Sequence, residues 1–517
     1  MATSSDTTST TDHSPTDGPA SDRSATVGSD TVAEAELLTP ETDAPATDAA
    51  ATDAPAADGP AVPGTSNRST TPQSTLFQDY ISSGWADQAS ELPAARSSAA
   101  FAAERRRTVS SALAGSRIVV PAGELKQRSN DTDYPFRPHS AFAHLTGWAS
   151  DSEPGAVLVL DPRDDGHEAT LYFRERAGRD SNEFYANPAI GEFWIGPRPS
   201  LAQVSADLGL ATAHIDAFVP GDDDRTVGSD PELDRVVSEL RLVKDAYEVA
   251  ELRGAVDATR RGFDDIVAEL PRLADRPRGE RVVEGVFYTR ARLDGNAVGY
   301  DTIAASGPHA CILHWTRNDG PVSAGDLILV DSGVEVDILY TADITRTLPV
   351  SGRFSPVQRK VYEAVREAAD AAFAIVRPGI VFREVHAEAM RVIARHTAEW
   401  GMLPGTAEES LEPDAQYHRR YMVHGTSHHL GLDVHDCAQA RREMYHDGTV
   451  EEGMVFTIEP GLYFQPDDLT VPEEFRGIGV RIEDDILVTV DGAENLSAGI
   501  PRSADDVEAW LSGRERA

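Results

Sequence analysis

The sequence predicts a protein of the α+β class in which two folded domains follow a disordered N-terminal tail. The composition changes near residue 73, from Ala, Thr, Ser, Asp and Pro to that of a globular protein. Strand-like apolar runs and helical stretches alternate from there to residue 241, and a long amphipathic stretch opens a second unit at residue 242. The length of 517 residues is enough for two or three domains.

The tail, residues 1–72, contains the imperfect repeat "ATDAPATDAAATDAPAADGP". Twelve of its first 70 residues are acidic and two are Arg. Such a segment has too little apolar area to offset the entropy lost on ordering, so we expect disorder. The favoured interpretation is a solubilising tail without a specific function.

The chain carries a formal net charge of −39, from 86 acidic and 47 basic residues. This charge disfavours nonspecific binding to nucleic acid or to an anionic membrane, so neither is expected as a partner. The N-terminus lacks the features of a secretory signal, and no run approaches the ~18 apolar residues of a spanning helix. The two cysteines, Cys311 and Cys437, suit a reducing compartment and are expected as buried apolar residues. A soluble cytoplasmic protein is therefore expected.

Residues 73–241 are expected to form an α/β domain. The stretch "GAVLVLDPRDDGHEATLYFRE" predicts two strands around a polar turn. The stretch "PSLAQVSADLGL" predicts a helix with Ser200 as its N-cap.

Residues 242–517 are expected to form the second domain, with a boundary near Leu242. The stretch "LRLVKDAYEVAELRGAVDATRRGFDDIVAEL" predicts its first helix. A further helix has Ser355 as N-cap and Pro356 in its first turn. The next, "FREVHAEAMRVIARHTAEWG", carries His386 and His396, which we interpret as surface or core residues and not as ligands.

Four predicted strands of this domain are apolar runs broken by acids: "GDLILVDSGVEV", "DITRTLPV", "GMVFTIEPGLYF" and "GIGVRIEDDILVTV". Asp331 follows "LILV", Asp343 follows "LYTA", Glu459 follows "VFTI" and Glu483 follows "GVRI". A carboxylate in an apolar strand is costly to bury unless it is paired or binds a metal. The repeated pattern therefore indicates a site.

The last of these strands puts Arg481, Glu483 and Asp485 on one face, because side chains alternate along a strand. Ile482 and Ile486 would point to the other face. A surface ladder of ion pairs is the alternative, but the apolar flanks favour a buried strand whose Arg orients or neutralises a ligand.

The stretch "HGTSHHLGLDVHD", residues 424–436, holds four of the fifteen histidines. His424 and His428 have the spacing of two zinc ligands on one helical face, but Gly425 and the other small and polar residues make a helix improbable. If His424, His428 and His435 line one pocket from a loop, four carboxylates and one imidazole favour Mn²⁺ or Mg²⁺ over a tetrahedral zinc site.

Four negative ligands also match two divalent cations and leave room for a bridging hydroxide. Two ions ~3.5 to 4 Å apart can hold that hydroxide as nucleophile and polarise a carbonyl, which predicts a hydrolase.

The second half of the chain resembles the pita-bread metallopeptidases, and most closely the Xaa-Pro aminopeptidases (aminopeptidase P, family M24B). The resemblance covers roughly residues 242–505. It rests on the order and spacing of "CILHWTRND", "DSGVEVDILYTADITRTLPV", "HGTSHHLGLDVHD", "TIEPGLYF" and "GIGVRIEDDILVT". The stretch "YPFRPHSAFAHLTGWASDSEPGAVLVL" is similar to the N-terminal domain of that family. A pita-bread catalytic domain behind this domain is the implied fold.

The resemblance implies two divalent metal ions, most often Mn²⁺, bridged by Asp343 and Glu483, with Asp331 on one ion and His428 and Glu459 on the other. It implies further residues that contact the substrate or the transition state. These are His314, His424, His435 and Arg481.

Within this scheme His424 and His435 are expected as catalytic donors to an oxyanion, an effect of ~3 to 4 kcal/mol per donor. Glu459 is expected to move a proton from water to the leaving proline nitrogen. His429 is expected to pack or to be partly exposed.

Asp331 and Asp343 are twelve residues apart, one more than the family spacing. A longer hairpin loop would absorb the extra residue. Otherwise Asp337 is the rival of Asp343 as a ligand.

The implied activity is release of the N-terminal residue from peptides with proline in the second position, by a homodimer or homotetramer. The alternatives are a prolidase, which cleaves Xaa-Pro dipeptides, and a methionine aminopeptidase. Prolidases tend to have "HGLGH" where this chain has "HGTSH", so Ser427 and "GLDVHD" favour the aminopeptidase. A metal-free pita-bread binding module is the alternative of another class, and it should have broken ligands, whereas all five are present.

Overall fold

The structure, a computed structural model, describes residues 68, 70–72, 74–274 and 276–513. The predicted tail lies almost wholly outside the described residues, so its disorder stays a prediction. The elements up to residue 240 are α1 (Thr75–Ile81), α2 (Ala99–Ala112), β1 (Ile118–Pro121), β2 (Gln127–Ser129), β3 (Thr132–Asp133), α3 (Ser140–Thr146), β4 (Val157–Arg163), β5 (Gly166–Phe173), α4 (Asn182–Ala186), α5 (Glu192–Ile195), α6 (Leu201–Leu208), β6 (Ala211–His214), the 3₁₀ turn η1 (Ile215–Ala217), β7 (Arg225–Thr226) and α7 (Pro231–Leu240).

These elements are built around a five-stranded mixed sheet with strand order β6-β5-β4-β1-β7. The predicted strand pair is confirmed, since β4 and β5 are antiparallel neighbours. The helix predicted after Ser200 is confirmed as α6, where Ser200 and Gln203 form a capping box. A separate core lies in this region, in which Phe142, Trp148 and Phe173 are fully buried.

The remaining elements belong to the second half of the chain. They are α8 (Ala246–Glu269), η2 (Leu270–Arg272), α9 (Gly279–Asp294), β8 (Ala297–Val298), β9 (Ile303–Ser306), η3 (Gly307–Cys311), β10 (Leu327–Ser332), β11 (Val334–Glu335), β12 (Ile344–Pro349), α10 (Pro356–Ile375), α11 (Arg383–Glu399), α12 (Ala407–Leu411), η4 (Tyr417–Arg420), β13 (Val455–Ile458), β14 (Gly461–Tyr463), η5 (Glu473–Phe475), β15 (Gly479–Arg481), β16 (Asp484–Val488), β17 (Ala493–Asn495) and α13 (Ala504–Leu511).

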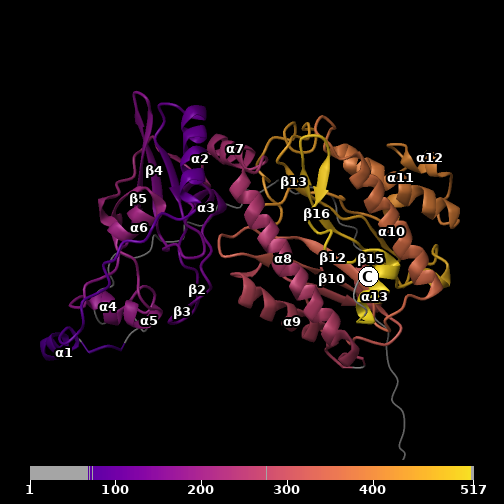
Figure 1. The fold of residues 1–517 in the computed structure, drawn as a ribbon, viewed down its shortest axis with the longest axis horizontal. Helices are drawn as coiled ribbons and strands as arrows, with labels where there is room; N and C mark the ends of the chain where they lie inside the picture. Colours follow the sequence, from indigo (N-terminus) through magenta and orange to yellow (C-terminus); the bar gives the residue numbers. More distant parts are fainter. Residues whose placement is uncertain (1–67, 69, 73, 275, 514–517) are drawn as a thin grey trace, which may run out of the picture. The chain divides into compact units, whose positions relative to one another are not determined.

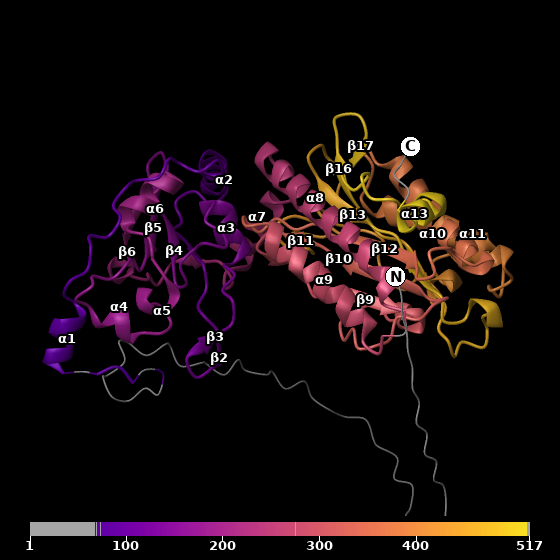
Figure 2. The ribbon, with the colours of Figure 1, turned by 60° about the horizontal axis from the view of Figure 1, so that its bottom comes forward.

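Two three-stranded antiparallel sheets, β12-β10-β9 and β13-β16-β17, form the centre of this half, together with the pairs β11-β8 and β14-β15. Two pairs of long helices support them. Helices α8 and α9 lie side by side and contact β11 and β9, while α10 and α11 lie side by side and α10 contacts β13 and β15 (Figure 1 and Figure 2). The strands are therefore held between helices, which leaves their ends to build a site.

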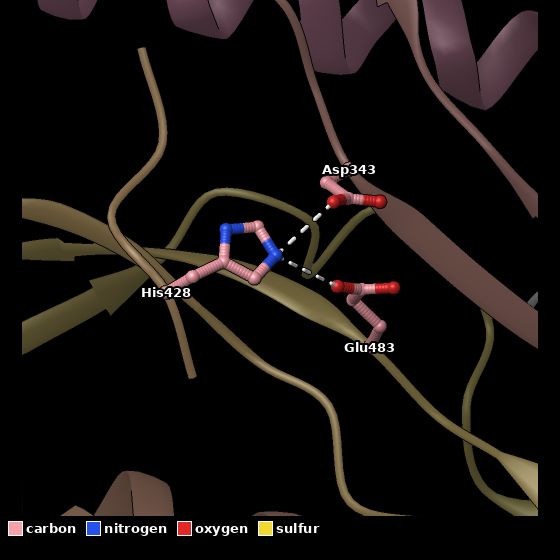
Figure 3. A group of neighbouring side chains, drawn as sticks. All are labelled: Asp343, His428 and Glu483. Atoms are coloured by element: carbon pink, nitrogen blue, oxygen red, sulfur yellow. Dashed lines mark ion pairs between the residues drawn. The ribbon is translucent and has the colours of Figure 1, made fainter. Parts of the chain in front are cut away.

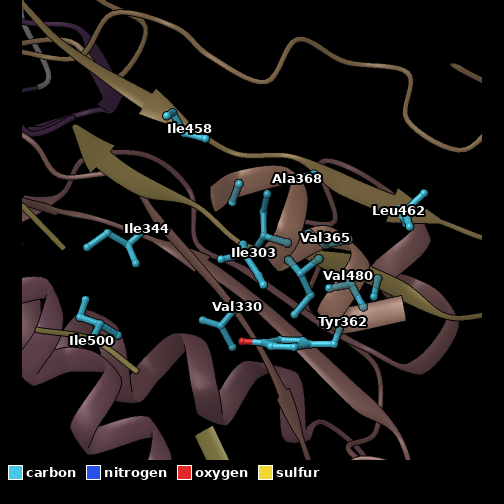
Figure 4. Packing of buried hydrophobic residues seen from close by; sticks show 14 of the residues in the cluster. Ile303, Val330, Ile344, Tyr362, Val365, Ala368, Ile458, Leu462, Val480 and Ile500 are labelled. Atoms are coloured by element: carbon cyan, nitrogen blue, oxygen red, sulfur yellow. The ribbon is translucent and has the colours of Figure 1, made fainter. Parts of the chain in front are cut away.

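The core of the second half is continuous from one sheet to the other. Figure 4 shows Val330 of β10 close to Tyr362 and Val365 of α10, with Val480 of β15 beside them. All four side chains are fully buried. The acids on these strands therefore lie next to a tightly packed apolar interior, where their positions are fixed by strand register.

The predicted helices of this half are confirmed, with their caps. Asp245 and Glu248 form a capping box at the start of α8, and Ser355 caps α10. Three of the predicted strands are each divided in the structure. The run around Asp331 forms β10 and β11, the run around Glu459 forms β13 and β14, and the run around Glu483 forms β15 and β16. The last two breaks fall at site acids, and the chain changes its pairing partner there.

Both cysteines are free and buried, as the sequence predicts. Within the described residues, no helix has the length and apolar character needed to cross a bilayer.

Candidate metal centre

Antiparallel pairing of β10 with β12 brings the two aspartates together. Asp331 lies in β10, and Asp343 immediately precedes β12, where Ser332 is paired with Ile344. The hydroxyl of Tyr300 lies 2.7 Å from the Asp331 carboxylate and 2.5 Å from the Asp343 carboxylate, and its single proton is shared between them. Two acids that share one donor must lie within a few ångström of each other.

Antiparallel pairing of β13 with β16 brings Glu459 and Glu483 together. Ile458 is paired with Asp484, so Glu459 and Glu483 extend the ladder by one step. The Glu483 N–H donates to the carbonyl of Thr345 at 3.1 Å, and the Thr345 hydroxyl donates to the Glu483 carboxylate at 2.7 Å. These bonds tie the glutamate pair to β12, next to Asp343.

The histidine segment runs beside β13 as an irregular antiparallel strand and not as a helix. The N–H groups of Glu459 and Thr457 donate to the carbonyls of Thr426 and His428, at 2.8 Å and 2.9 Å. His428 then points its Nε2 at the acids and lies 3.6 Å from Glu459. Figure 3 shows the same atom directed at Asp343, at 3.3 Å, and at Glu483, at 4.0 Å.

The donor set fits divalent metal ions. Ligand atoms of Asp343, His428 and Glu483 all lie within 4.8 Å of one another, and all three side chains are buried or nearly so. Asp331 and Glu459 adjoin them in the same cavity. Four carboxylates crowded into a buried site repel one another unless cations offset their charge, and hard oxygen ligands suit such ions.

Burial and crowding shift the titration of these groups. Burial raises the pKa of Glu459 to about 8 and raises that of Glu483 well above its ordinary value, with neighbouring acids adding to both shifts. Burial and the Asp331 charge also raise the pKa of Asp343. Burial alone would lower the pKa of His428, but its hydrogen bond to Asp343 and the Glu459 charge raise it to about 9. Without metal the site therefore retains protons at neutral pH.

A cavity of about 670 Å³ opens above the five side chains, and the four predicted substrate residues line it. His314 and His435 are exposed at its wall, and the His435 ring meets the edge of the His428 ring at a centroid distance of 4.4 Å. Partial shielding of the His435 ring from water by the cavity wall, with the charges of His428 and His314, lowers its pKa to about 4. The ring is therefore neutral at pH 7.

His424 and Arg481 belong to one hydrogen-bonded chain. His424 Nδ1 lies 2.6 Å from the Gly425 carbonyl, so it carries the proton, and Nε2 lies 2.7 Å from the Tyr463 hydroxyl. Arg481 donates to that hydroxyl at 3.1 Å and forms an ion pair with Asp331 at 2.5 Å. Burial and the Arg481 charge lower the pKa of His424 to about 3. Both ring nitrogens are thus engaged, and His424 would have to release Gly425 to donate to a ligand.

Known proteins share this arrangement of segments. The model of metallopeptidase family M24 matches residues 250–490, and the model of the aminopeptidase P N-terminal domain matches residues 102–219. Xaa-Pro aminopeptidase 2 of Streptomyces coelicolor is 51% identical over 456 residues, which covers 83% of this chain and 94% of that protein. The Xaa-Pro aminopeptidase of Escherichia coli is 34% identical over 451 residues, covering 80% of this chain and 97% of that protein. The chain belongs to the Xaa-Pro aminopeptidase family of M24 metallopeptidases.

Solved structures agree with this assignment. Aminopeptidase P from Escherichia coli with the inhibitor Pro-Leu has a TM-score of 0.70 and 32% identity, covering 80% of this chain and 98% of that chain. A zinc-substituted form of the same E. coli enzyme in complex with product gives the same TM-score at 31% identity, with the same coverage. The predicted fold, a pita-bread catalytic domain behind an aminopeptidase P N-terminal domain, is confirmed. The boundaries at residues 73 and 242 stay predictions.

The segment between the two aspartates turns through a loop before it reaches Asp343. The Leu339 N–H donates to the Val336 carbonyl at 2.7 Å, and Leu339 has a left-handed φ of 74°. Asp337 is exposed in this loop, whereas Asp343 is buried in the cavity. The position of Asp343 in the cavity therefore favours it over Asp337 as a metal ligand.

His386, His396 and His429 lie away from the four acids of the metal centre. His429 is 1% exposed, stacks on Phe382 at 4.7 Å and meets Tyr445 edge-on at the same distance. His386 bonds to Thr426 at 3.3 Å, and His396 forms an ion pair with Glu367. None of the three lines the cavity.

Sequence reasoning missed two tyrosines around the acids and gave a third polar side chain, Asp485, no role. Tyr300 bridges the two aspartates, and Tyr463 joins His424 to Arg481. Asp485 accepts the Asp343 backbone N–H at 3.2 Å, so it holds a ligand from behind. Asp485 had been placed on the site face of its strand without a role. Tyrosine is common at buried and partly buried positions, so it does not stand out in the sequence as a carboxylate in an apolar strand does.

Proposed function

We propose that the chain is a dinuclear metal-dependent aminopeptidase that releases the N-terminal residue from peptides with proline in the second position. One observation carries this proposal: His428 lies within 3.3 to 4.0 Å of three acids, two of them buried and one partly buried, at a cavity large enough for a short peptide. The names of the relatives, which are Xaa-Pro aminopeptidases, support the substrate class.

The proposed metal ligands are the five predicted side chains. Asp343 and Glu483 would bridge two ions, Asp331 would complete one site, and His428 and Glu459 would complete the other. When bound, two divalent ions supply an activated water and polarise a scissile carbonyl. Mn²⁺ is the proposed metal because four oxygen donors and one imidazole suit it.

The rest of the chemistry belongs to side chains of the cavity. Glu459 is proposed to take a proton from the attacking water and to deliver it to the proline nitrogen. His435 is the better placed of the two predicted oxyanion donors, because it is neutral and exposed to the cavity. His424 is proposed to donate after it releases Gly425, with Tyr463 and Arg481 orienting it.

A single assay separates the candidate activities. The purified protein is incubated with Mn²⁺ and offered a Xaa-Pro dipeptide, a Xaa-Pro-Yaa tripeptide, a Xaa-Ala-Yaa tripeptide and a Met-Ala peptide. We expect cleavage of the Xaa-Pro-Yaa tripeptide, with the Xaa-Ala-Yaa tripeptide as the matched control. Cleavage of the dipeptide alone would instead identify a prolidase. Fewer than one ion per chain after Mn²⁺ loading would favour the metal-free binding module.

Two further assignments complete the proposal. A homodimer or homotetramer is expected from the family resemblance, and light scattering of the purified protein tests it. A cytoplasmic location agrees with two free, buried cysteines, which need no oxidising compartment.

A further inference from the structure

Arg137 lies in the segment that leads into α3, in the N-terminal half of the chain, yet its partners belong to the catalytic half. Its Nε donates to the Glu335 carboxylate at 2.8 Å, and its Nη2 donates to the Leu432 carbonyl at 2.7 Å. The same Nη2 lies 3.4 Å from the Asp433 carboxylate. One guanidinium group therefore holds two segments that are almost a hundred residues apart in the sequence.

Both of these segments carry site residues. Leu432 and Asp433 lie between His428 and His435, so their positions determine where the His435 ring stands. Glu335 ends β11 and begins the loop that leads to Asp343. Arg137 thus fixes the approach of the histidine segment to the aspartate segment.

The partners of Arg137 are themselves firmly held. Glu335 is 4% exposed and accepts a second hydrogen bond from the Asn296 side chain at 2.8 Å. Asp433 accepts a bond from the Ser140 hydroxyl at 2.5 Å and pairs with Arg241 at 3.4 Å. A planar guanidinium can donate in two directions at once, which an ammonium group does less well.

The segment that carries His435 is also held by the linker between the two halves of the chain, which contains Arg241 and Lys244. Asp436 is buried and pairs with Arg241 at 3.0 Å and with Lys244 at 3.3 Å. Its N–H donates to the His429 carbonyl at 2.9 Å. Segment 431–437 is therefore fixed from both the linker and the N-terminal half, with His435 at its centre.

We propose that Arg137 is a positioning residue of the catalytic site, which acts from the N-terminal half by holding the His435-bearing segment against the loop that leads to Asp343. This inference rests on the proposed aminopeptidase function. Arg137 is not among the residues that line the cavity, so it acts through Leu432, Asp433 and Glu335.

The first test is Arg137→Ala in the full-length protein loaded with Mn²⁺. We expect kcat on a Xaa-Pro-Yaa tripeptide to fall by roughly 10- to 100-fold, because small misplacements of catalytic groups cost about that much. KM should change less than threefold, and the metal content should stay at the wild-type value. Arg117→Ala is the matched control, since Arg117 pairs with Asp161 and Asp224 in the same half of the chain. It should keep kcat within twofold.

A double-mutant cycle separates positioning from general damage. If Arg137 acts through His435, then Arg137→Ala should cost little further kcat in a His435→Ala background. Arg137→Lys keeps the charge and should fold even where the alanine variant does not. It should lose kcat by a smaller factor, because one ammonium group does not span both Glu335 and the Leu432 carbonyl.

Two results would overturn the inference: kcat of Arg137→Ala or of Arg137→Lys within twofold of wild type, or an equal fold loss in the His435→Ala and wild-type backgrounds. Failure of the proposed function looks different, because the wild-type protein itself would then leave the Xaa-Pro-Yaa tripeptide uncut.

Discussion

Metal loading should release protons, because the metal-free site holds protons that metal ligands must lose. The pKa of Glu459 is raised to about 8 and that of His428 to about 9, while that of Glu483 lies well above its ordinary value. A doubly protonated imidazole has no nitrogen lone pair for a cation, and a neutral carboxylic acid is a much weaker ligand than a carboxylate. The apparent affinity for metal should therefore rise with pH.

The size of the effect follows from these values. At pH 7, Glu459 and His428 together hold roughly 1.9 protons, and at pH 8.5 they hold roughly 1.0. Proton release on full loading should therefore fall by about one between pH 7 and pH 8.5. Near pH 7 the apparent overall binding constant should rise by at least about 100-fold per pH unit.

Isothermal titration of the metal-free protein with Mn²⁺ measures this release directly. The titration is repeated in two buffers of different ionisation enthalpy, at pH 7 and at pH 8.5. Glu459→Gln should release about one proton fewer at pH 7, whereas Asp337→Asn, at an exposed acid outside the cavity, should behave as wild type. An enthalpy independent of the buffer at pH 7 would refute the reasoning, as would an affinity that does not change with pH.

Further predictions concern single side chains of the site. His428→Ala should lose metal and activity together, whereas His435→Ala should keep its metal and lose mainly kcat; equal metal loss by elemental analysis would contradict this division. His429→Ala should lower the unfolding free energy by about 2 to 4 kcal/mol in urea titrations while metal content is retained, because the ring is buried. Arg481→Ala should cost about 3 to 5 kcal/mol in the metal-free protein, because Asp331 loses its buried partner, and clearly less after Mn²⁺ loading. Unfolding with and without Mn²⁺ checks this, and equal losses in both states would count against it.

Helices could be predicted from the sequence with their caps, because the signals that start a helix are local. Ser200 and Ser355 were expected as caps and form capping boxes in the structure. Strands were predicted as single apolar runs, but they break where pairing changes. Pro460 has no N–H, so the ladder cannot continue through it, and the chain after it pairs with β15 in place of β16. Pairing partners come from distant segments, and local pattern does not contain them.

The acids of the site, unlike the strand pairing, could be found from the local sequence. A carboxylate within an apolar run is unusual, and its neighbours alone reveal it. All four predicted carboxylates line one cavity with His428. Tyr300 and Tyr463 are as important to the hydrogen bonding, yet they were missed because a tyrosine, unlike a carboxylate, is ordinary at a buried or partly buried position. The roles of the acids were implied only by family resemblance, and spacing alone did not choose between Asp343 and Asp337.

The histidine stretch shows most clearly what strand register adds. His424 and His428 have a spacing that suits one face of a helix, but an even spacing also suits one face of a strand. The main-chain bonds of Thr426 and His428 to β13 show that the strand interpretation holds from residue 426 on. Consecutive side chains then alternate, so His428 faces the acids while His429 packs on Phe382. If the pairing of this segment with β13 shifted by one residue, His429 would face the acids and His428 would pack on the apolar side. The main-chain bonds to β13 are therefore as important to the site as the imidazole ligand itself.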